Sequence, residues 1–213
     1  MSDLLAGLNE PQRQAVLHAD GPLLMLAGAG SGKTRALTHR IAYLIREGGV
    51  PPWRILAVTF TNKAAAEMRE RVAQLLGDGD APWVATFHAS CVRILRQEAE
   101  RLGFTRAFTI YDDSDQLRLL KDVLKELGIS EKSLKPRAAA VYIDQAKNRG
   151  QFPEQLADDD QRDDVALRVY AQYQQRLKQA NALDFGDLLL YAVHLFEQHQ
   201  DVLEAYRQRF AHI

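Results

Sequence analysis

The pattern of apolar and polar residues divides the chain into two parts near residue 88. Before that point, continuous apolar runs at 22–26, 55–60 and 83–88 have the length and composition of buried strands. The segments between these runs carry apolar residues at helical spacing. Because strands and helices alternate, this part is predicted to form a right-handed parallel α/β unit. Helices are expected over 9–17, 34–47 and 61–76.

From residue 89 onward the pattern is almost entirely helical. Apolar residues recur at the spacing of one helical face, and acidic residues supply N-caps. The run 151–164, which contains three consecutive aspartates, is predicted to be a solvated loop. We therefore expect an all-helical subdomain at 89–210, a first α/β part at 1–88 and a short return to it at 211–213. Further helices are predicted over 90–102, 112–127, 136–147, 162–180, 184–198 and 201–210, with a short extended piece at 108–111.

Composition indicates a globular chain whose positive and negative charges nearly balance. Of its 213 residues 46% are apolar, and 27 Lys and Arg stand against 28 Asp and Glu, a formal charge of −1. Any contact with nucleic acid must therefore come from a local surface. No segment approaches the ~18 apolar residues of a membrane span, and the N-terminus lacks a secretory pattern. We expect a cytoplasmic protein without a membrane partner.

The cysteine and the histidines do not suggest redox or zinc chemistry. Cys91 is the one cysteine, which excludes an internal disulfide and fits a reducing compartment. His194 and His199 are five residues apart, so they do not share one face of a helix well. Neither feature predicts a metal site.

The residues that carry chemistry follow the first predicted strand. Ala27–Thr34 reads AGAGSGKT and lies between an apolar run and an amphipathic helix, which is the context of a phosphate-binding loop, although the strict motif has glycine at the first position. Small residues let backbone N–H groups curl around a phosphate, and the next helix points its positive end at the same anion. Lys33 is expected to reach the β- and γ-phosphates, and the Thr34 hydroxyl to bind Mg²⁺. The alternative is a glycine-rich turn that happens to carry Lys-Thr.

Polar residues follow all three predicted strands. In open α/β sheets ligands bind beyond the carboxyl ends of the strands, so the loops after residues 26, 58 and 86 should converge. Taken alone, Phe60 is better explained as a core residue at a strand end, and His88 as a hydrogen-bonded structural histidine.

Five motifs resemble, in order and spacing, the superfamily 1A DNA helicases of the UvrD/Rep/PcrA type. They are Leu8-Asn9 with Gln12, AGAGSGKT followed by Arg35, ILAVTFTNKAA at 55–65, TFH at 86–88 and LDFGDL at 183–188. The resemblance covers essentially the whole chain. It implies a P-loop NTPase (RecA-like) parallel-sheet subdomain, truncated, with an inserted all-helical subdomain. It also implies the N-terminal part of an ATP-dependent 3′–5′ DNA helicase of repair or replication.

The resemblance implies a role for each matching residue. Gln12 would read adenine, Lys33 and Thr34 would act on the phosphates and Mg²⁺, and Arg35 would lie beside the base or ribose. The cofactors would be ATP and Mg²⁺, and the partners single-stranded DNA or a junction of single- and double-stranded DNA, with repair or replication proteins. The remaining nucleotide-binding residues would be Ala27, Gly28, Ala29, Gly30, Ser31 and Gly32. The DNA-binding residues would be Thr59, Phe60, Thr61, Asn62, Lys63, Thr86, Phe87 and His88.

One motif of the family is absent. The family continues beyond the position of Ile213 into a strand bearing the Asp-Glu pair of its second nucleotide motif, and hydrolysis needs such carboxylates. Asp184 and Asp187 do not replace them, because no apolar strand precedes them. We therefore expect this chain to bind nucleotide and DNA without unwinding DNA by itself. Two alternatives are a truncated module that binds without hydrolysing, and a different P-loop enzyme such as a small kinase, which leaves the matches at 59–63 and 86–88 unexplained.

Overall fold

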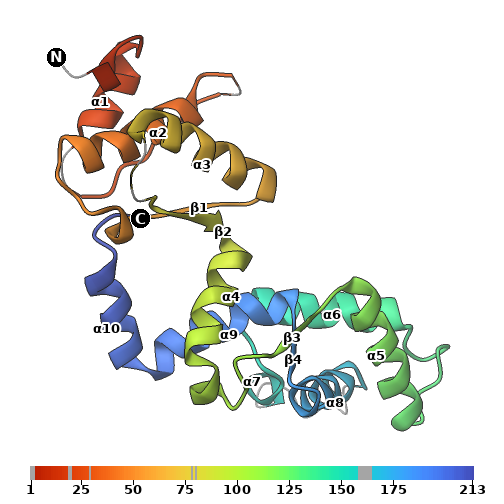
Figure 1. Ribbon diagram of the computed structural model, residues 1–213. Coiled ribbons are helices and arrows are strands. Elements are labelled where there is room, and N and C mark those ends of the chain that lie inside the picture. The colour runs from red at the N-terminus through yellow and green to blue at the C-terminus, as the bar shows by residue number, and fades with distance from the viewer. Residues whose placement is uncertain (1–2, 19–20, 29, 78, 80, 158–164) are drawn as a thin grey trace. The chain divides into compact units, whose positions relative to one another are not determined.

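The chain forms two compact units. The computed structural model describes residues 3–18, 21–28, 30–77, 79, 81–157 and 165–213. The first unit comprises Met1–Phe87 and Glu204–Ile213, and the second comprises His88–Leu203. The architecture is mixed α/β, with short parallel strand pairs and predominant helix (Figure 1).

The first unit is built around one parallel strand pair. Strands β1 (Leu56–Thr59) and β2 (Trp83–Thr86) run parallel, in register from Leu56 opposite Trp83 to Thr59 opposite Thr86. The helices are α1 (Glu10–Leu17), α2 (Lys33–Arg46) and α3 (Asn62–Leu76), with single 3₁₀ turns at Asp3–Leu5 and Pro52–Arg54. Helix α1 packs on α2, and an apolar cluster joins α2 and α3 to the strands. The cluster consists of Ile41, Ile55, Ala57, Met68, Val72 and Val84.

The strand predicted over 22–26 is not formed, and that prediction was wrong. The segment carries no assigned strand, and Leu24 and Leu26 are 80% and 88% exposed. A strand needs a hydrogen-bonding neighbour, and both edges of β1 already have one: β2 lies along one edge, and at the other the Leu56 N–H donates to the His212 carbonyl over 3.0 Å. The apolar composition of 22–26 signals a preference for burial but does not supply a pairing partner.

The second unit is mainly helical. Its core lies where α5 (Asp113–Glu126), α6 (Pro136–Asn148) and α8 (Val165–Gln179) pack together, and includes the fully buried Tyr170 and Tyr173. The chain enters through α4 (Phe87–Glu98) and leaves through α10 (Gln200–Arg209). Its other elements are the 3₁₀ turn Ala99–Leu102, β3 (Thr109–Tyr111), α7 (Pro153–Ala157), β4 (Ala182–Asp184) and α9 (Phe185–Gln198).

Three details differ from the sequence prediction, two of them in this unit and one in the strand that precedes it. The unit is not all-helical, because β3, which lies within the extended piece predicted at 108–111, pairs in parallel with β4, a three-residue strand that was not predicted and is too short to leave a periodic signal. Part of the predicted loop 151–164 is the helix α7, and 158–164 lie outside the described residues. The strand expected over 83–88 ends at Thr86, where its pairing with β1 also ends, so Phe87 and His88 begin α4.

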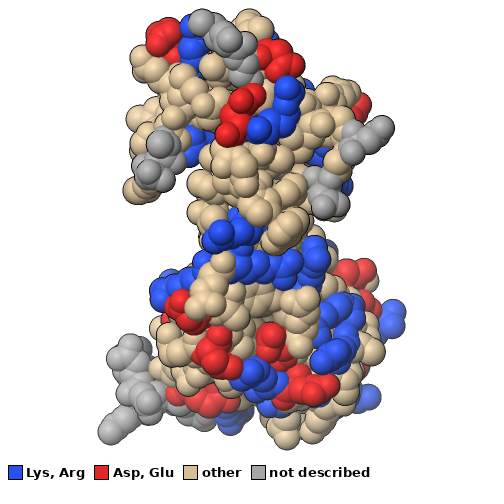
Figure 2. All heavy atoms as spheres, turned by 60° about the vertical axis from the view of Figure 1, so that its left-hand side comes forward, with Lys and Arg blue, Asp and Glu red and all other residues tan. Residues whose placement is uncertain are grey.

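Charge is mixed on the surface. On the face shown in Figure 2, basic and acidic side chains both occur on each unit, in keeping with the formal charge of −1. Within the described residues, no helix combines the length and the apolar character that crossing a membrane requires.

Candidate nucleotide and DNA sites

The glycine-rich residues 27–28 and 30–32 lead directly into α2, which begins at Lys33. Gly30 and Gly32 adopt left-handed φ angles of 75° and 85°, a conformation that favours glycine. Gly32 is the N-cap of α2, so the loop delivers the chain to the N-terminus of a 14-residue helix. The Ser31 hydroxyl closes the turn by donating to the Gly28 carbonyl over 2.7 Å. The loop therefore meets the backbone requirements of an anion site at a helix N-terminus.

The Lys33 ammonium points back into this loop. Its Nζ donates to the carbonyls of Ala27 at 2.6 Å and of Gly28 at 2.8 Å. Peptide carbonyls are neutral acceptors, and charge-assisted bonds to phosphate oxygens are stronger. The lysine is thus placed where an anion can draw it away from the backbone. Thr34 and Arg35 follow on α2 and are exposed, whereas Ala29 lies outside the described residues.

Helix α1 lies against the same loop. Asn9 and Gln12 form a reciprocal capping box at the start of α1, and Gln12 Nε2 also donates to the Ser31 carbonyl over 3.0 Å. The glutamine therefore links α1 to the phosphate-loop candidate. A cavity of about 620 Å³ opens between them. It is lined by α1 side chains, by Leu23, Leu24, Met25, Leu26 and Ala27, and by Ser31, Gly32, Lys33 and Ala36.

The loop conformation provides a first prediction, on Gly32→Ala. A Cβ at Gly32 would lie 2.5 Å from Gln12 Nε2, and the residue has φ +85°. We expect the substitution to lower the unfolding free energy of this unit by about 1–2 kcal/mol, the cost of a left-handed non-glycine residue. The measurement is urea unfolding followed by tryptophan fluorescence. Gly28→Ala is the matched control, since its Cβ would meet open space, and an equal loss in both variants would contradict the prediction.

The turn between β1 and α3 presents an aromatic ring to solvent. Thr61 caps α3 by accepting a hydrogen bond from the Ala64 N–H over 3.1 Å, and Phe60, immediately before it, is 87% exposed. The interpretation of Phe60 as a core residue was therefore wrong. Phe60 lies beside Phe87, with ring centroids 5.4 Å apart and planes tilted by 42°. The rings form one exposed surface, with the exposed Lys63 nearby in sequence.

The other predicted DNA-facing residues differ in exposure. Asn62 is exposed, Thr59 is half-buried, and Thr86 is buried within β2. His88 belongs to the second unit and is half-buried on α4. Its ring contacts Phe185 edge-on, with centroids 5.9 Å apart and planes at 88°.

Phe185 is a residue that the sequence analysis did not single out. It is the first residue of α9 and is 48% exposed. Together with His88 it lines a cavity of about 280 Å³, whose other walls carry several aspartates. The available signal was the LDFGDL motif, in which the spacing of Asp184 and Asp187 predicts a helix cap and places Phe185 at its start.

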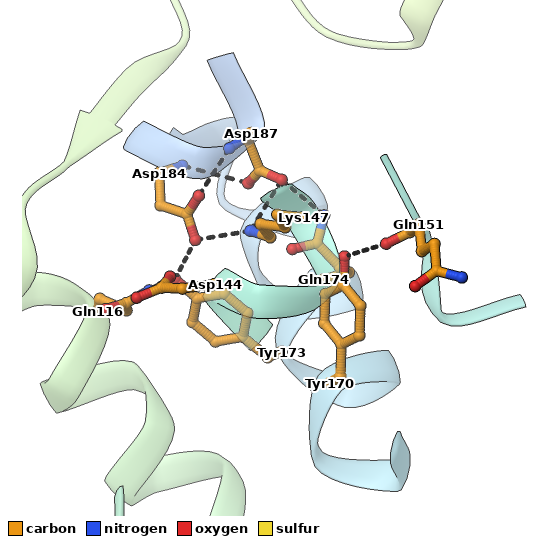
Figure 3. Close-up of polar contacts among 9 residues, drawn as sticks. All are labelled: Gln116, Asp144, Lys147, Gln151, Tyr170, Tyr173, Gln174, Asp184 and Asp187. Atoms are coloured by element: carbon orange, nitrogen blue, oxygen red, sulfur yellow. Dashed lines mark hydrogen bonds and ion pairs between the residues drawn. The ribbon is translucent and has the colours of Figure 1, made fainter. Parts of the chain in front are cut away.

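A buried cluster of charges lies at the start of α9, where Asp184 directly precedes Phe185 (Figure 3). Lys147 Nζ lies 2.6 Å from Asp184 Oδ2 and 2.8 Å from Asp187 Oδ1. The Tyr173 hydroxyl donates to Asp184 over 2.8 Å, and Gln174 Nε2 donates to Asp187 over 3.0 Å. All three charged side chains are almost completely inaccessible to solvent.

The carboxyl groups of this cluster have unequal proton affinities. Burial acts to raise the pKa of Asp184, but the charge and hydrogen bond of Lys147, together with hydrogen bonds from the Asp187 N–H and the Tyr173 hydroxyl, outweigh it, so the pKa is lowered. Burial raises the pKa of Asp187 to about 6, with Asp184 adding to the rise and Lys147 opposing it. Burial likewise raises the pKa of Tyr173, which keeps its hydroxyl protonated as a donor. Among the described residues, no group of three His, Cys, Asp or Glu side chains is arranged to hold a metal ion.

Comparison with known proteins identifies the family. Residues 8–213 match the family described as the UvrD/REP helicase N-terminal domain. The chain belongs to this family. It is 49% identical over 215 residues to the ATP-dependent DNA helicase PcrA of Bacillus subtilis, and 47% identical over 216 residues to the proteins of that name from Staphylococcus aureus and Staphylococcus epidermidis.

The aligned region covers all of this helicase-family chain but only part of its relatives. It spans 29% of the Bacillus subtilis protein and 30% of each staphylococcal protein. The family resemblance stated from the motifs is confirmed. The roles of individual residues in binding nucleotide and DNA stay predictions.

Proposed function

We propose that this chain is the N-terminal, ATP- and DNA-binding part of an ATP-dependent 3′–5′ DNA helicase that acts in the cytoplasm in repair or replication. The first unit would be the RecA-like P-loop subdomain and the second its inserted helical subdomain. The observation that carries the proposal is the geometry of Lys33. Its ammonium group points into the glycine-rich loop, and Lys33 and Gln12 both line the cavity beside that loop. The names of the relatives agree with it.

The nucleotide would bind with its phosphates in the loop 27–34. Backbone N–H groups and the N-terminus of α2 favour the negative charge, and Lys33 would exchange its carbonyl partners for phosphate oxygens. Gln12 would meet the adenine edge from α1. The Thr34 hydroxyl, in the first turn of α2, would be the protein ligand of Mg²⁺. When bound, the ion neutralises charge on the phosphates.

Single-stranded DNA would stack on the exposed aromatic residues. The pair of Phe60 and Phe87 suits this role because every base has a π-face, so stacking tolerates any sequence. Their centroid separation of 5.4 Å leaves no room for a base between the rings, so a base would lie on the pair. Lys63 and the hydroxyls of Thr59 and Thr61 would contact phosphates. Phe185 and His88 would provide the aromatic surface of the second unit.

The two ligands would be coupled through adjoining parts of the first unit. DNA would contact the turn that follows β1, while ATP would bind at the N-terminus of α2, whose Ile41 shares an apolar cluster with Ala57 of β1. Closure around ATP would therefore shift the DNA-contacting turn. The carboxylates that position water for hydrolysis are assigned to no described residue, and binding is the activity proposed for the 213-residue chain.

A second prediction tests the DNA surface through Phe60→Ala. Loss of one stacking platform costs about 1–3 kcal/mol, so we expect the affinity of the chain for single-stranded oligonucleotides to fall about tenfold. The loss should be similar for oligo-dT and mixed sequences. Fluorescence anisotropy with labelled oligonucleotides at fixed salt measures it.

The matched control is Trp53→Ala. Trp53 is also a large, exposed aromatic residue of the first unit, at 57%, and lies outside the proposed DNA surface. Its removal should leave the affinity unchanged. If Phe60→Ala binds as tightly as the wild type, the first unit does not hold DNA on this aromatic pair.

A further inference from the structure

The N-terminal turn of α9 is held in two ways at once. Asp184 Oδ1 accepts a hydrogen bond from the Asp187 N–H over 2.8 Å, and Asp187 Oδ2 accepts one from the Asp184 N–H over 3.2 Å. The other oxygen of each carboxylate, Asp184 Oδ2 and Asp187 Oδ1, contacts Lys147 Nζ. One lysine therefore bridges the two ends of the capping box (Figure 3).

A helix cap alone does not require this arrangement. Helix α5 begins with the same pair of residue types, Asp112 and Asp115, in a reciprocal capping box. There Asp112 is exposed and Asp115 half-exposed, and neither forms one of the ion pairs found among the described residues. Desolvating a lysine and two carboxylates is costly. The charges at α9 thus call for an explanation beyond capping.

Glycine at position 186 leaves room for the side chain of Lys147. A Cβ at Gly186 would lie 2.9 Å from Lys147 Cδ and 3.4 Å from Lys147 Cβ. The stem of Lys147 therefore runs directly against the backbone of the turn. Tyr173 and Gln174 of α8 donate to the same two carboxylate oxygens that Lys147 contacts, so both α6 and α8 hold this turn of α9.

Phe185 is the exposed aromatic residue in this turn. It directly follows Asp184 and precedes Gly186, so its backbone is fixed by the cluster while the residue is 48% exposed. The ring stands at 88° to His88, which lies in α4 and is held independently of α9 by its own helix. A small rotation of the turn would separate these rings.

We propose that Lys147 is a positioning residue for single-stranded DNA: by bridging Asp184 and Asp187 it fixes the first turn of α9 so that Phe185 stands edge-on to His88 as a stacking surface for a base. This inference rests on the proposed function, because it takes Phe185 to be a DNA contact. Lys147 itself, being buried, does not touch the DNA.

The test is a double-mutant cycle on the 213-residue chain. Affinity for a labelled single-stranded oligonucleotide is measured for the wild type, Phe185→Ala, Lys147→Met and the double variant. We expect each single change to lower the affinity about tenfold, the order of one stacking contact, and the double variant to lose no more than Phe185→Ala alone. Binding of a fluorescent ATP analogue, which concerns the first unit, should be unchanged in all four proteins.

Gly186→Ala keeps the test decisive if Lys147→Met does not fold. The added methyl group would displace the lysine stem without removing any charge, so a loss of DNA affinity with a native circular dichroism spectrum is expected. Lys125→Met, an exposed lysine on α5, is the control and should bind normally.

The outcomes separate the two proposals. Equal losses from Lys147→Met with and without Phe185 would overturn the positioning role, because the lysine would then act elsewhere. Full affinity in a folded Lys147→Met or Gly186→Ala variant would overturn it as well. If Phe185→Ala binds normally, or the wild type does not bind single-stranded DNA, the proposed DNA surface of the second unit fails and the inference fails with it.

Discussion

Replacing Lys33 with alanine is expected to lower the affinity of the chain for ATP and Mg²⁺ at least about a hundredfold. A charge-assisted hydrogen bond contributes roughly 1.5–3 kcal/mol, and Lys33 has the reach for two oxygens, as its contacts with the Ala27 and Gly28 carbonyls show. Alanine leaves the loop and the α2 N-terminus in place but removes the cation. Isothermal titration calorimetry with the 213-residue chain measures the change.

Lys63→Ala is the control for this experiment. Lys63 is exposed in the first turn of α3 and belongs to the proposed DNA surface, so its loss should leave nucleotide affinity intact. In the intact gene product, Lys33→Ala should also remove ATP hydrolysis stimulated by single-stranded DNA. Unchanged nucleotide binding would show that the loop is a glycine-rich turn and not the site. An unstimulated wild type would favour a module that binds without hydrolysing.

Helices and their caps could be predicted well because their signals are local. Asn9 was the predicted cap of its helix, and the later cap candidates were Thr61 or Asn62 and Asp112, Asp113 or Ser114. The N-caps are Asn9, Thr61 and Asp112, each accepting a backbone N–H within three residues along the chain. The signal of the phosphate-loop candidate is also local, since Gly30 and Gly32 predict the turn and Lys33 predicts its positive charge. Such features need no knowledge of distant residues.

Pairing and exposure could not be predicted, because both depend on distant residues. The apolar run 22–26 gives the same signal as a strand, yet pairing depends on what borders β1, and His212 occupies that edge from far along the chain. Phe60 shows the same limit, since an aromatic residue at a strand end is equally consistent with core and surface. The family resemblance, and not the residue pattern, indicated a surface role for it.

The buried charges of the second unit show this limit most clearly. Lys147 and Asp184 are 37 residues apart, and in the sequence each resembles an ordinary surface residue. The run LDFGDL predicts a helix cap, but nothing local indicates that a lysine from α6 completes it. The pair forms only because α6 packs against α9 and because Gly186, which has no side chain, leaves room for Lys147.

Lys147→Met should destabilise the second unit by about 3–5 kcal/mol at pH 8, the usual cost of leaving a buried charge without its partner. Methionine fills much of the space of the lysine stem, so the loss reports on the two carboxylates. Urea unfolding followed by far-ultraviolet circular dichroism measures it. Trp53 and Trp83 both lie in the first unit, so their fluorescence supplies an internal reference for that unit. The exposed Lys125→Met variant should change stability by less than about 0.5 kcal/mol.

The destabilisation should shrink as the pH falls from 8 to 5. In the wild type the attraction of Lys147 favours the ionised form of both carboxyl groups; without it, the folded-state pKa values of Asp184 and Asp187 rise. A carboxyl whose folded-state pKa exceeds its unfolded value binds more protons when folded, so stability is lost as pH rises through that range and regained as pH falls. Asp187, whose pKa is already about 6 in the wild type, should protonate first. An equal loss at pH 8 and pH 5 would mean that methionine disturbs packing and that the carboxylates do not depend on the lysine charge.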